Sequence, residues 1–177
     1  MAITRKLHFS THAELKNVIG QDLINDDNIA IIELVKNGID AGARRVKLSF
    51  VEELADGDTA TGPAILLEDD GSGMSAEDVQ YKWLNIAYSE KKELQVKGRV
   101  LAGNKGVGRF ACDRLGTKLD MYTQRKGEAL LHVEVDWTAF EGKKKVDDSI
   151  QKVDVFLREA TPERMKEKVG HALRAKG

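Results

Sequence analysis

Two stretches, IIELVKNGIDAGA at residues 31–43 and LLEDDGSGM at residues 66–74, decide the fold expected of this sequence. In a helix, the first stretch carries Glu33, Asn37 and Asp40 on a single polar stripe, because they are spaced four and three residues apart. The apolar residues expected to pack inward from roughly the opposite side are Ile31, Ile32, Val35 and Ile39. One face of this helix therefore packs, and the other can hold a ligand.

The second stretch leads from a buried-type strand at 64–67 into acidic residues and two glycines, Gly71 and Gly73. Glycine has no Cβ, so backbone at these positions can approach a flat ligand closely. Taken singly, an acidic-amide stripe is usually a solvated helix face, and Asp-Gly after a strand is usually a hairpin turn. Their occurrence in this order, followed by GNKGVGRFA at 103–111, indicates an ATP site.

These three motifs together resemble the GHKL superfamily of gyrase, ninety-kilodalton heat-shock chaperones, histidine kinases and MutL. The matching residues are Glu33, Asn37, Asp40 and Ala41, then Asp69, Gly71, Gly73 and Met74, then Gly103, Gly106 and Gly108. The resemblance covers about residues 25–125. It implies a Bergerat-type fold, an α+β two-layer sandwich with a mixed, mostly antiparallel sheet and helices on one face. In that fold a further strand beginning with Gly-Thr completes the sheet, so we expect this chain to stop just before it.

The resemblance implies a role for each residue of the first two motifs. Glu33 would orient and deprotonate the attacking water, and Asn37 would offer an amide oxygen to Mg²⁺. Asp40 would support the metal's water shell or the pocket wall, unless it is purely structural. Asp69 would face adenine, because a carboxylate only accepts hydrogen bonds and repels the carbonyl oxygen of guanine. Met74 would offer the ring a polarizable contact.

The third motif lies in a basic, glycine-rich stretch at 89–109, which the resemblance identifies as an ATP lid that orders on binding. Its glycines would present backbone N–H groups to the phosphates, with Lys105 as a nearby charge. The lid residues expected to contact the nucleotide are Ser89, Lys91, Gly103, Asn104, Lys105, Gly106, Val107, Gly108, Arg109 and Phe110. A Walker A loop is excluded, because Asn104 stands where that motif requires lysine. Residues 106–111 match a relaxed dinucleotide-binding fingerprint, but the βαβ pattern that NAD binding requires is missing around them.

Composition adds few constraints on function. Lysine and arginine total 28 against 29 for aspartate and glutamate, so the net charge of −1 gives no global attraction to nucleic acid or anionic membranes. The single Cys112 excludes an intramolecular disulfide, and the four histidines show no metal-ligand spacing. Without a long apolar run or a signal-peptide pattern, we expect a cytoplasmic protein whose residues 1–177 form one ATP-binding domain.

Local patterns predict the remaining elements. Helices are expected at 11–20, from the Asp26-Asp27-Asn28 cluster to Gly42, from Ser75, at 110–115 and from Thr161-Pro162. Strands are expected at 45–51, 64–67, 118–123, 129–137 and 153–157, the first two as a hairpin across a polar, turn-rich connection.

Glu33 and the Asp-Ala-Gly-Ala that follows the first motif favour the chaperone, MutL and MORC branch, although Arg109 and Ala111 depart from the chaperone pattern. We therefore expect Mg²⁺-dependent binding and slow hydrolysis of ATP, which drive lid closure and homodimerisation of a larger chaperone-like or DNA-acting protein. The alternatives are a nucleotide-gated interaction module without hydrolysis and a histidine-kinase-type catalytic domain.

Overall fold

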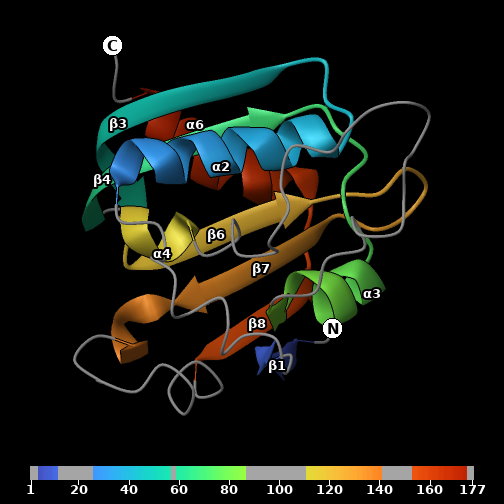
Figure 1. Cartoon of the computed structure of the whole chain (residues 1–177). Helices are drawn as coiled ribbons and strands as arrows, with labels where there is room; N and C mark the ends of the chain where they lie inside the picture. The colour runs from blue at the N-terminus through green and yellow to red at the C-terminus, as the bar shows by residue number, and fades with distance from the viewer. Residues whose placement is uncertain (1–3, 12–25, 57–58, 87–110, 141–152, 175–177) are drawn as a thin grey trace.

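The central sheet has four antiparallel strands within the part of the chain that is described, in the order β1-β8-β7-β6 (Figure 1). The computed structural model describes residues 4–11, 26–56, 59–86, 111–140 and 153–174. The strands are β1 (Arg5–His8), β6 (Lys118–Thr123), β7 (Leu131–Asp136) and β8 (Asp154–Glu159). The last three were expected from sequence, whereas β1 was not.

The core lies on one face of this sheet. Successive side chains of a strand point to opposite faces, so Val133, Val135, Val155 and Leu157 are buried together. They pack with residues from outside the strands, namely Phe9, Val79, Leu84, Trp137 and Val153. The aromatic ring of Phe9 stacks on Trp137, with ring centroids 5.4 Å apart.

A long hairpin of β3 (Val46–Asp56) and β4 (Thr59–Asp69) forms a separate two-stranded sheet. Its register pairs Val46 with Asp69, and a bulge interrupts it between Val51 and Leu54. The expected hairpin is confirmed, but both strands continue into the stretch interpreted as a turn-rich connection. Backbone hydrogen bonds form an antiparallel ladder without requiring apolar side chains, which explains the difference.

Helix α2 (Asp27–Asp40) is the helix predicted from the first motif. Asp26 caps it, because its carboxylate accepts the backbone N–H of Asn28 at 2.7 Å and of Ile29 at 3.3 Å. The helix ends at Asp40, and Gly42 then adopts a positive φ of 80°.

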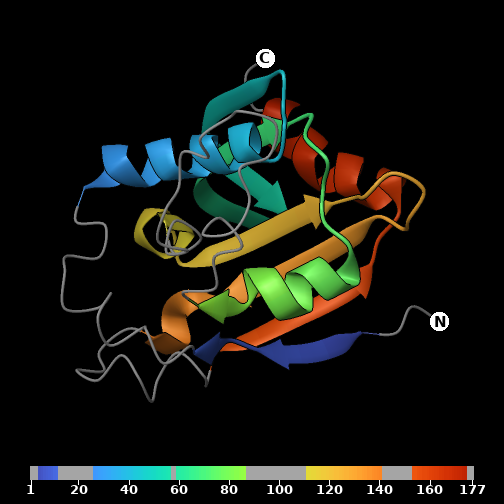
Figure 2. The same ribbon diagram turned by 45° about the vertical axis from the view of Figure 1, so that its right-hand side comes forward.

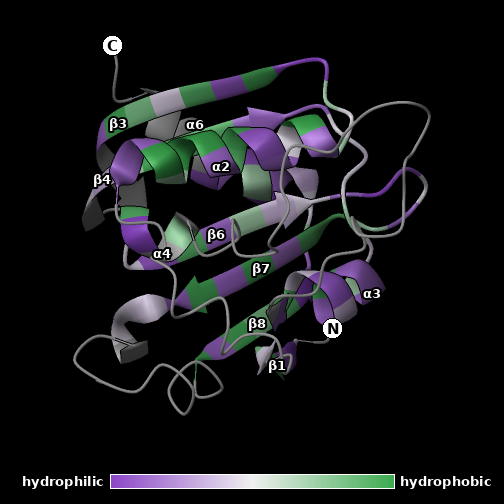
Figure 3. Ribbon diagram, in the orientation of Figure 1, coloured by the Kyte–Doolittle hydropathy of each residue, from purple (hydrophilic) through white to green (hydrophobic). Residues whose placement is uncertain are grey.

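The expected packing face of α2 is partly wrong. Ile32 and Ile39 are 51% and 54% exposed, and the residues that are buried are Ala30 and Gly38. In Figure 3 the ribbon of α2 shows hydrophobic segments in green next to hydrophilic ones in purple. A Cβ on Gly38 would lie 3.0 Å from Val46 Cγ2, so the helix approaches the hairpin through its small residues rather than through its isoleucines.

Helix α3 (Ala76–Asp78) begins at the predicted cap, Ser75, and continues as the π-helical turn η1 (Val79–Trp83). Ser75 and Asp78 form a reciprocal capping box. The short strand β5 (Asn85–Ile86) then pairs in parallel with β2 (Ser10–Thr11). Thr11 is therefore in a strand rather than in the helix expected at 11–20, and the other residues of that expected helix lie outside the described residues.

Two further helices match the sequence patterns, α4 (Ala111–Leu115) and α6 (Pro162–Arg174), and the 3-10 turn η4 (Trp137–Phe140) follows β7. Helices α2, α3 and α4 lie on one side of the sheet, whereas α6 lies on the other (Figures 1 and 2). There Lys168 Nζ donates to Asp120 Oδ1 at 2.9 Å. The α+β class is confirmed, but the single helical face holds only for the first three helices. None of the described helices has the length and apolar character needed to span a membrane.

Candidate functional site

The first two sequence motifs meet in space at the C-terminal end of α2. The backbone N–H of Ser72 donates to the carbonyl oxygen of Ala41 at 2.9 Å. A Cβ on Gly71 would lie 2.8 Å from Ala41 Cβ, and one on Gly38 would lie 3.3 Å from Asp69 Cβ. Such contacts leave room for glycine but not for larger residues. Both glycines therefore let the loop at 69–74 lie directly against α2. This loop is called the base loop below, after the nucleotide base that it is expected to contact.

The polar stripe on α2 lies at the border between the buried and exposed sides of the helix. Glu33 and Asp40 are half-buried, and Asn37 is exposed. The Glu33 carboxylate accepts a hydrogen bond from Lys36 Nζ at 2.6 Å, an ion pair that the sequence analysis did not include. The Asn37 side chain makes no hydrogen bond to any other described residue. Its amide is therefore available to a ligand, whereas Glu33 already has a cationic neighbour.

Asp69 and Asp70 have different tasks in the base loop. Asp69 is exposed, and its Oδ1 accepts the backbone N–H of Gly71 at 2.9 Å, while no described residue donates to Oδ2. Asp70 Oδ1 accepts the backbone N–H groups of Arg45 at 2.8 Å and Arg44 at 2.7 Å. Those two hydrogen bonds, the one from Arg45 foremost, lower the pKa of Asp70 below its ordinary value. Asp70 thus fixes the loop and leaves Asp69 to face outward.

The far end of the base loop contacts the end of β6. Gly73 has a φ of +64°, and a Cβ there would lie 2.0 Å from the carbonyl oxygen of Gln124. Next to it, the Met74 backbone N–H donates to the hydroxyl of Thr123 at 2.9 Å, and the Met74 side chain packs against the core. Gly73 and Met74 were expected from sequence to contact a nucleotide base. No sequence signal pointed to Thr123, whose partner is 49 residues away.

Asp78, which follows the base loop in α3, is a buried carboxylate with four polar contacts. It accepts from Ser75 N and Ser75 Oγ, and it pairs with Lys82 at 3.0 Å and Arg125 at 2.5 Å. Burial alone would raise its pKa, but the hydrogen bonds from Ser75 and Lys82 outweigh burial and lower the pKa to about 2. Asp78 therefore stays charged at neutral pH and anchors the start of α3.

The predicted lid lies outside the described residues, so the structure does not place its proposed contacts with ATP. These are Ser89, Lys91, Gly103, Asn104, Lys105, Gly106, Val107, Gly108, Arg109 and Phe110. The described chain resumes at α4, beside α2, where Arg114 Nε contacts Asp27 Oδ1 at 2.6 Å. That ion pair places the segment after the third motif next to the helix that carries the first.

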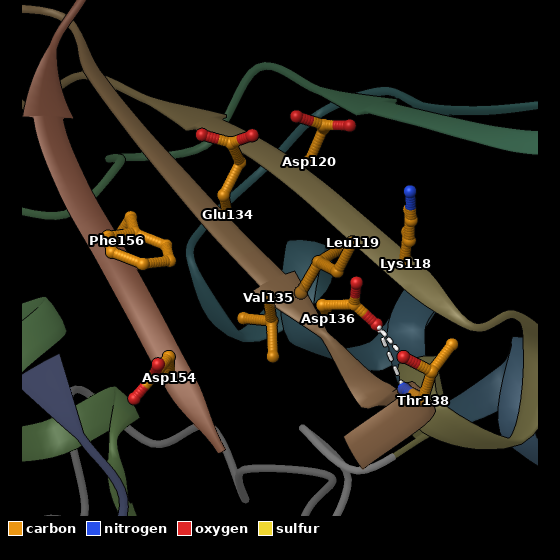
Figure 4. A pocket seen from close by; sticks show the side chains of 9 residues that line it. All are labelled: Lys118, Leu119, Asp120, Glu134, Val135, Asp136, Thr138, Asp154 and Phe156. Carbon is orange, nitrogen blue, oxygen red and sulfur yellow. Dashed lines mark hydrogen bonds between the residues drawn. The ribbon is translucent and has the colours of Figure 1, made fainter. Parts of the chain in front are cut away.

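A hollow of about 370 Å³ lies on the other face of the sheet and contains none of the predicted site residues (Figure 4). Its lining includes Asp120, Glu134, Asp136 and Asp154, and among the described residues Lys118 is its one cationic side chain. Three of these carboxylates pair with cations, Asp120 with Lys168, Glu134 with Arg158 and Asp154 with Lys6. The hollow is therefore not the site that the sequence motifs predict, in spite of its size.

The described residues include no group of three or more His, Cys, Asp or Glu side chains arranged to hold a metal ion. Mg²⁺ prefers oxygen ligands and commonly binds through one or two protein groups together with substrate phosphates. The exposed amide of Asn37, beside the half-buried Asp40, fits that mode of binding.

Comparison with known proteins agrees with this geometry. Residues 25–169 match the family model described as histidine kinase-, DNA gyrase B-, and HSP90-like ATPase. One curated relative, "Putative type II restriction enzyme HgiDII" of Herpetosiphon aurantiacus, is 28% identical over 98 residues. The match covers 54% of this chain but only 14% of that protein, so the chain is similar to a small part of it. The matched residues include α2, the base loop and strands β6, β7 and β8. The chain therefore belongs to the family of histidine kinase-, DNA gyrase B- and HSP90-like ATPases.

Proposed function

We propose that the chain binds ATP with Mg²⁺ where α2 meets the base loop and hydrolyses it slowly. The observation that carries this proposal is the close approach at Gly38 and Gly71, which brings the polar stripe of α2 and Asp69 to one place. A triphosphate needs a polar wall beside it, and a base needs a polar group that fixes its orientation. The glycines serve this site by letting the loop pack closely, because the Cβ positions of Gly71 and Gly73 are filled by Ala41 and by the Gln124 carbonyl oxygen.

In this proposal Asp69 selects the base. Its free oxygen Oδ2 accepts a hydrogen bond from the exocyclic amino group of adenine, while Oδ1 stays bonded to Gly71 N. Guanine presents a carbonyl oxygen at that position, and two acceptors repel each other. ATP should therefore bind better than GTP.

Glu33 is the proposed general base for hydrolysis, because a carboxylate on a rigid helix can be held within hydrogen-bonding distance of a water molecule. Lys36 holds this carboxylate in the described structure, at 2.6 Å. Asn37, and Asp40 through water, would hold the metal. Mg²⁺, when bound, neutralises charge on the phosphates and orients them.

The ion pair between Glu33 and Lys36 also favours a second candidate, a nucleotide-gated interaction module that binds ATP without hydrolysing it. An oxygen that already accepts a hydrogen bond from Lys36 has less capacity left to accept one from water. Turnover distinguishes the two functions, since a module of this kind binds ATP tightly and produces no ADP.

For the whole protein we propose a larger setting. Residues 89–109 close over the nucleotide as a lid, and closure drives ATP-dependent homodimerisation. The similarity to part of a protein described as a putative type II restriction enzyme supports a role in a DNA-acting system, in preference to a chaperone.

Calorimetry and a steady-state ATPase assay test this function. Glu33→Ala should lower turnover roughly 100-fold or more while nucleotide affinity changes little, because the carboxylate acts on water in the transition state. Asn37→Ala should lose Mg²⁺-dependent binding. Lys36→Met, as the matched control, frees Glu33 and should keep or raise turnover. Normal turnover in Glu33→Ala would show that Glu33 is not the general base.

A further inference from the structure

The base loop is held at both ends, by different parts of the fold. At its first end Asp70 accepts two backbone N–H groups from the connection between α2 and β3, and Ser72 N bonds to Ala41 O. Those contacts come from the segment that directly follows the helix with the polar stripe. Its second end rests on β6 and on the turn that follows β6, far from α2 in sequence.

Three consecutive residues make the second attachment, each through a different kind of contact. Thr123 Oγ1 accepts the Met74 N–H at 2.9 Å, and Thr123 is itself buried. The Gln124 carbonyl oxygen occupies the space that a Cβ on Gly73 would need. Arg125 Nη2 pairs with the buried Asp78 at 2.5 Å. The loop itself is therefore held by a hydrogen bond and a close contact. Arg125 adds an ion pair to α3, whose Asp78 also accepts the N–H of Ser75, the residue that follows the loop.

The turn that supplies these contacts is itself well braced. Glu128 N donates to Arg125 O at 3.0 Å, and Gln124 Nε2 donates to Glu128 O at 3.0 Å. Gly127 provides the positive φ, +84°, that such a tight turn requires. A braced turn transmits its position to whatever it holds, so the far side of the base loop is placed by the β6–β7 hairpin.

We propose that Thr123 and Arg125 are positioning residues for the nucleotide base. They do not touch the ligand, but they hold in place the base loop that contacts it. This inference rests on the proposed ATP site. If the loop loses its second attachment, Gly71 to Met74 gain freedom that binding must then remove, and affinity falls. The loss should concern the base and not the phosphates.

Asp78 provides a matched pair of variants for the test. Lys82 and Arg125 both pair with this carboxylate, but only Arg125 connects it to the hairpin. Arg125→Met and Lys82→Met each remove one positive charge from the same partner. Calorimetry and displacement titrations would measure ATP, ADP and adenosine, with Arg125→Lys as a conservative rescue and Thr123→Val as a second route to the same defect.

We expect Arg125→Met to weaken all three ligands by the same factor, about three- to tenfold, and Lys82→Met to weaken them less than twofold. Arg125→Lys should recover part of the loss, and Thr123→Val should resemble Arg125→Met. Exchange of the backbone amide hydrogens at residues 71–74 should accelerate in Arg125→Met but not in Lys82→Met.

Equal losses in Arg125→Met and Lys82→Met would overturn the inference, since the effect would then be general to Asp78. A larger loss for ATP than for adenosine would also overturn it, because Arg125 would be acting on phosphates. If the unaltered protein bound none of the three ligands, the proposed function would fail and this inference with it. Binding by the unaltered protein separates that failure from the other two.

Discussion

At the scale of single residues, Asp69 makes the most specific chemical prediction. Asp69→Asn should lower ATP affinity by about 1.5–3 kcal/mol, because the charge-assisted bond to the adenine amino group is lost. Glu68→Gln is the control, because it removes the same charge from an exposed neighbouring residue, one that pairs with Lys47. Calorimetry with ATP and GTP measures both effects. Equal affinity of the unaltered protein for the two nucleotides would contradict base selection by Asp69.

Gly73 makes a prediction about stability. A Cβ at this position would lie 2.0 Å from the Gln124 carbonyl oxygen, on backbone with a φ of +64°. Gly73→Ala should therefore lower the free energy of unfolding by about 3 kcal/mol or more, measured by urea denaturation. Gly127→Ala is the control, because Gly127 has a φ of +84° but no atom within 4 Å of its Cβ position. It should cost only about 1 kcal/mol, and equal losses would show that backbone strain alone matters.

The buried carboxylate of Asp78 predicts how stability depends on pH. Its folded-state pKa of about 2 lies below the ordinary value of 3.8. A depressed pKa contributes stability that is fully present above pH 3.8 and is lost as the pH falls toward 2, about 2 kcal/mol in all. Urea denaturation of the unaltered protein and of Asp78→Asn should therefore differ at pH 7 and converge near pH 2. A difference that stayed constant over this range would mean that Asp78 acts through packing rather than charge.

At the scale of elements, a polar network joins α6 to the outer face of the sheet. His132 is 2% exposed, its Nε2 lies 2.7 Å from Asp120 Oδ1, and its Nδ1 accepts from Arg158 Nε at 3.2 Å. Arg158 also pairs with Glu134. Burial would raise the pKa of Asp120, but the hydrogen bonds from His132 and Lys168 lower it. The buried imidazole of His132 therefore connects Asp120, which Lys168 of α6 contacts, to Arg158 of β8.

Removing the centre of this network should cost more than removing its edge. His132→Ala loses both hydrogen bonds and the stacked ring of Tyr122, 4.3 Å away, and should destabilise the fold by about 3 kcal/mol. Lys168→Met breaks only a partly exposed ion pair and should cost about 1 kcal/mol or less. Thermal or urea unfolding measures both. A larger effect of Lys168→Met would mean that α6 is held mainly by its charge.

At the scale of the whole molecule, the proposed lid and dimer can be tested by mass. The full-length protein should dimerise with a non-hydrolysable ATP analogue and remain monomeric with ADP, as measured by light scattering. Residues 1–177 alone should bind nucleotide, hydrolyse it slowly and stay mainly monomeric. If the full-length protein had the same mass with both nucleotides, closure would not be coupled to assembly. Equal rates and masses for the two chains would contradict the proposed contribution of a longer chain to dimerisation.

The sequence by itself determined the local elements and the chemistry of the motifs. Asp26 and Ser75 were recognisable caps, and the alternation at 118–123 and 153–157 predicted strands that the structure contains. The three motifs pointed to the ATPase family that the comparison then confirmed. These signals are readable because capping and side-chain periodicity depend on residues only a few positions apart.

Only the tertiary structure decided how those elements fit together. It placed β1 beside β8, buried Gly38 in preference to Ile32 and Ile39, and brought Thr123 to Met74. Such contacts join residues far apart in the chain, and no local pattern encodes which distant partner a buried face or a free N–H will meet. The base loop illustrates the division: its glycines and Asp69 were visible in the sequence, but the two attachments that hold it exist only once α2 and β6 pack on either side.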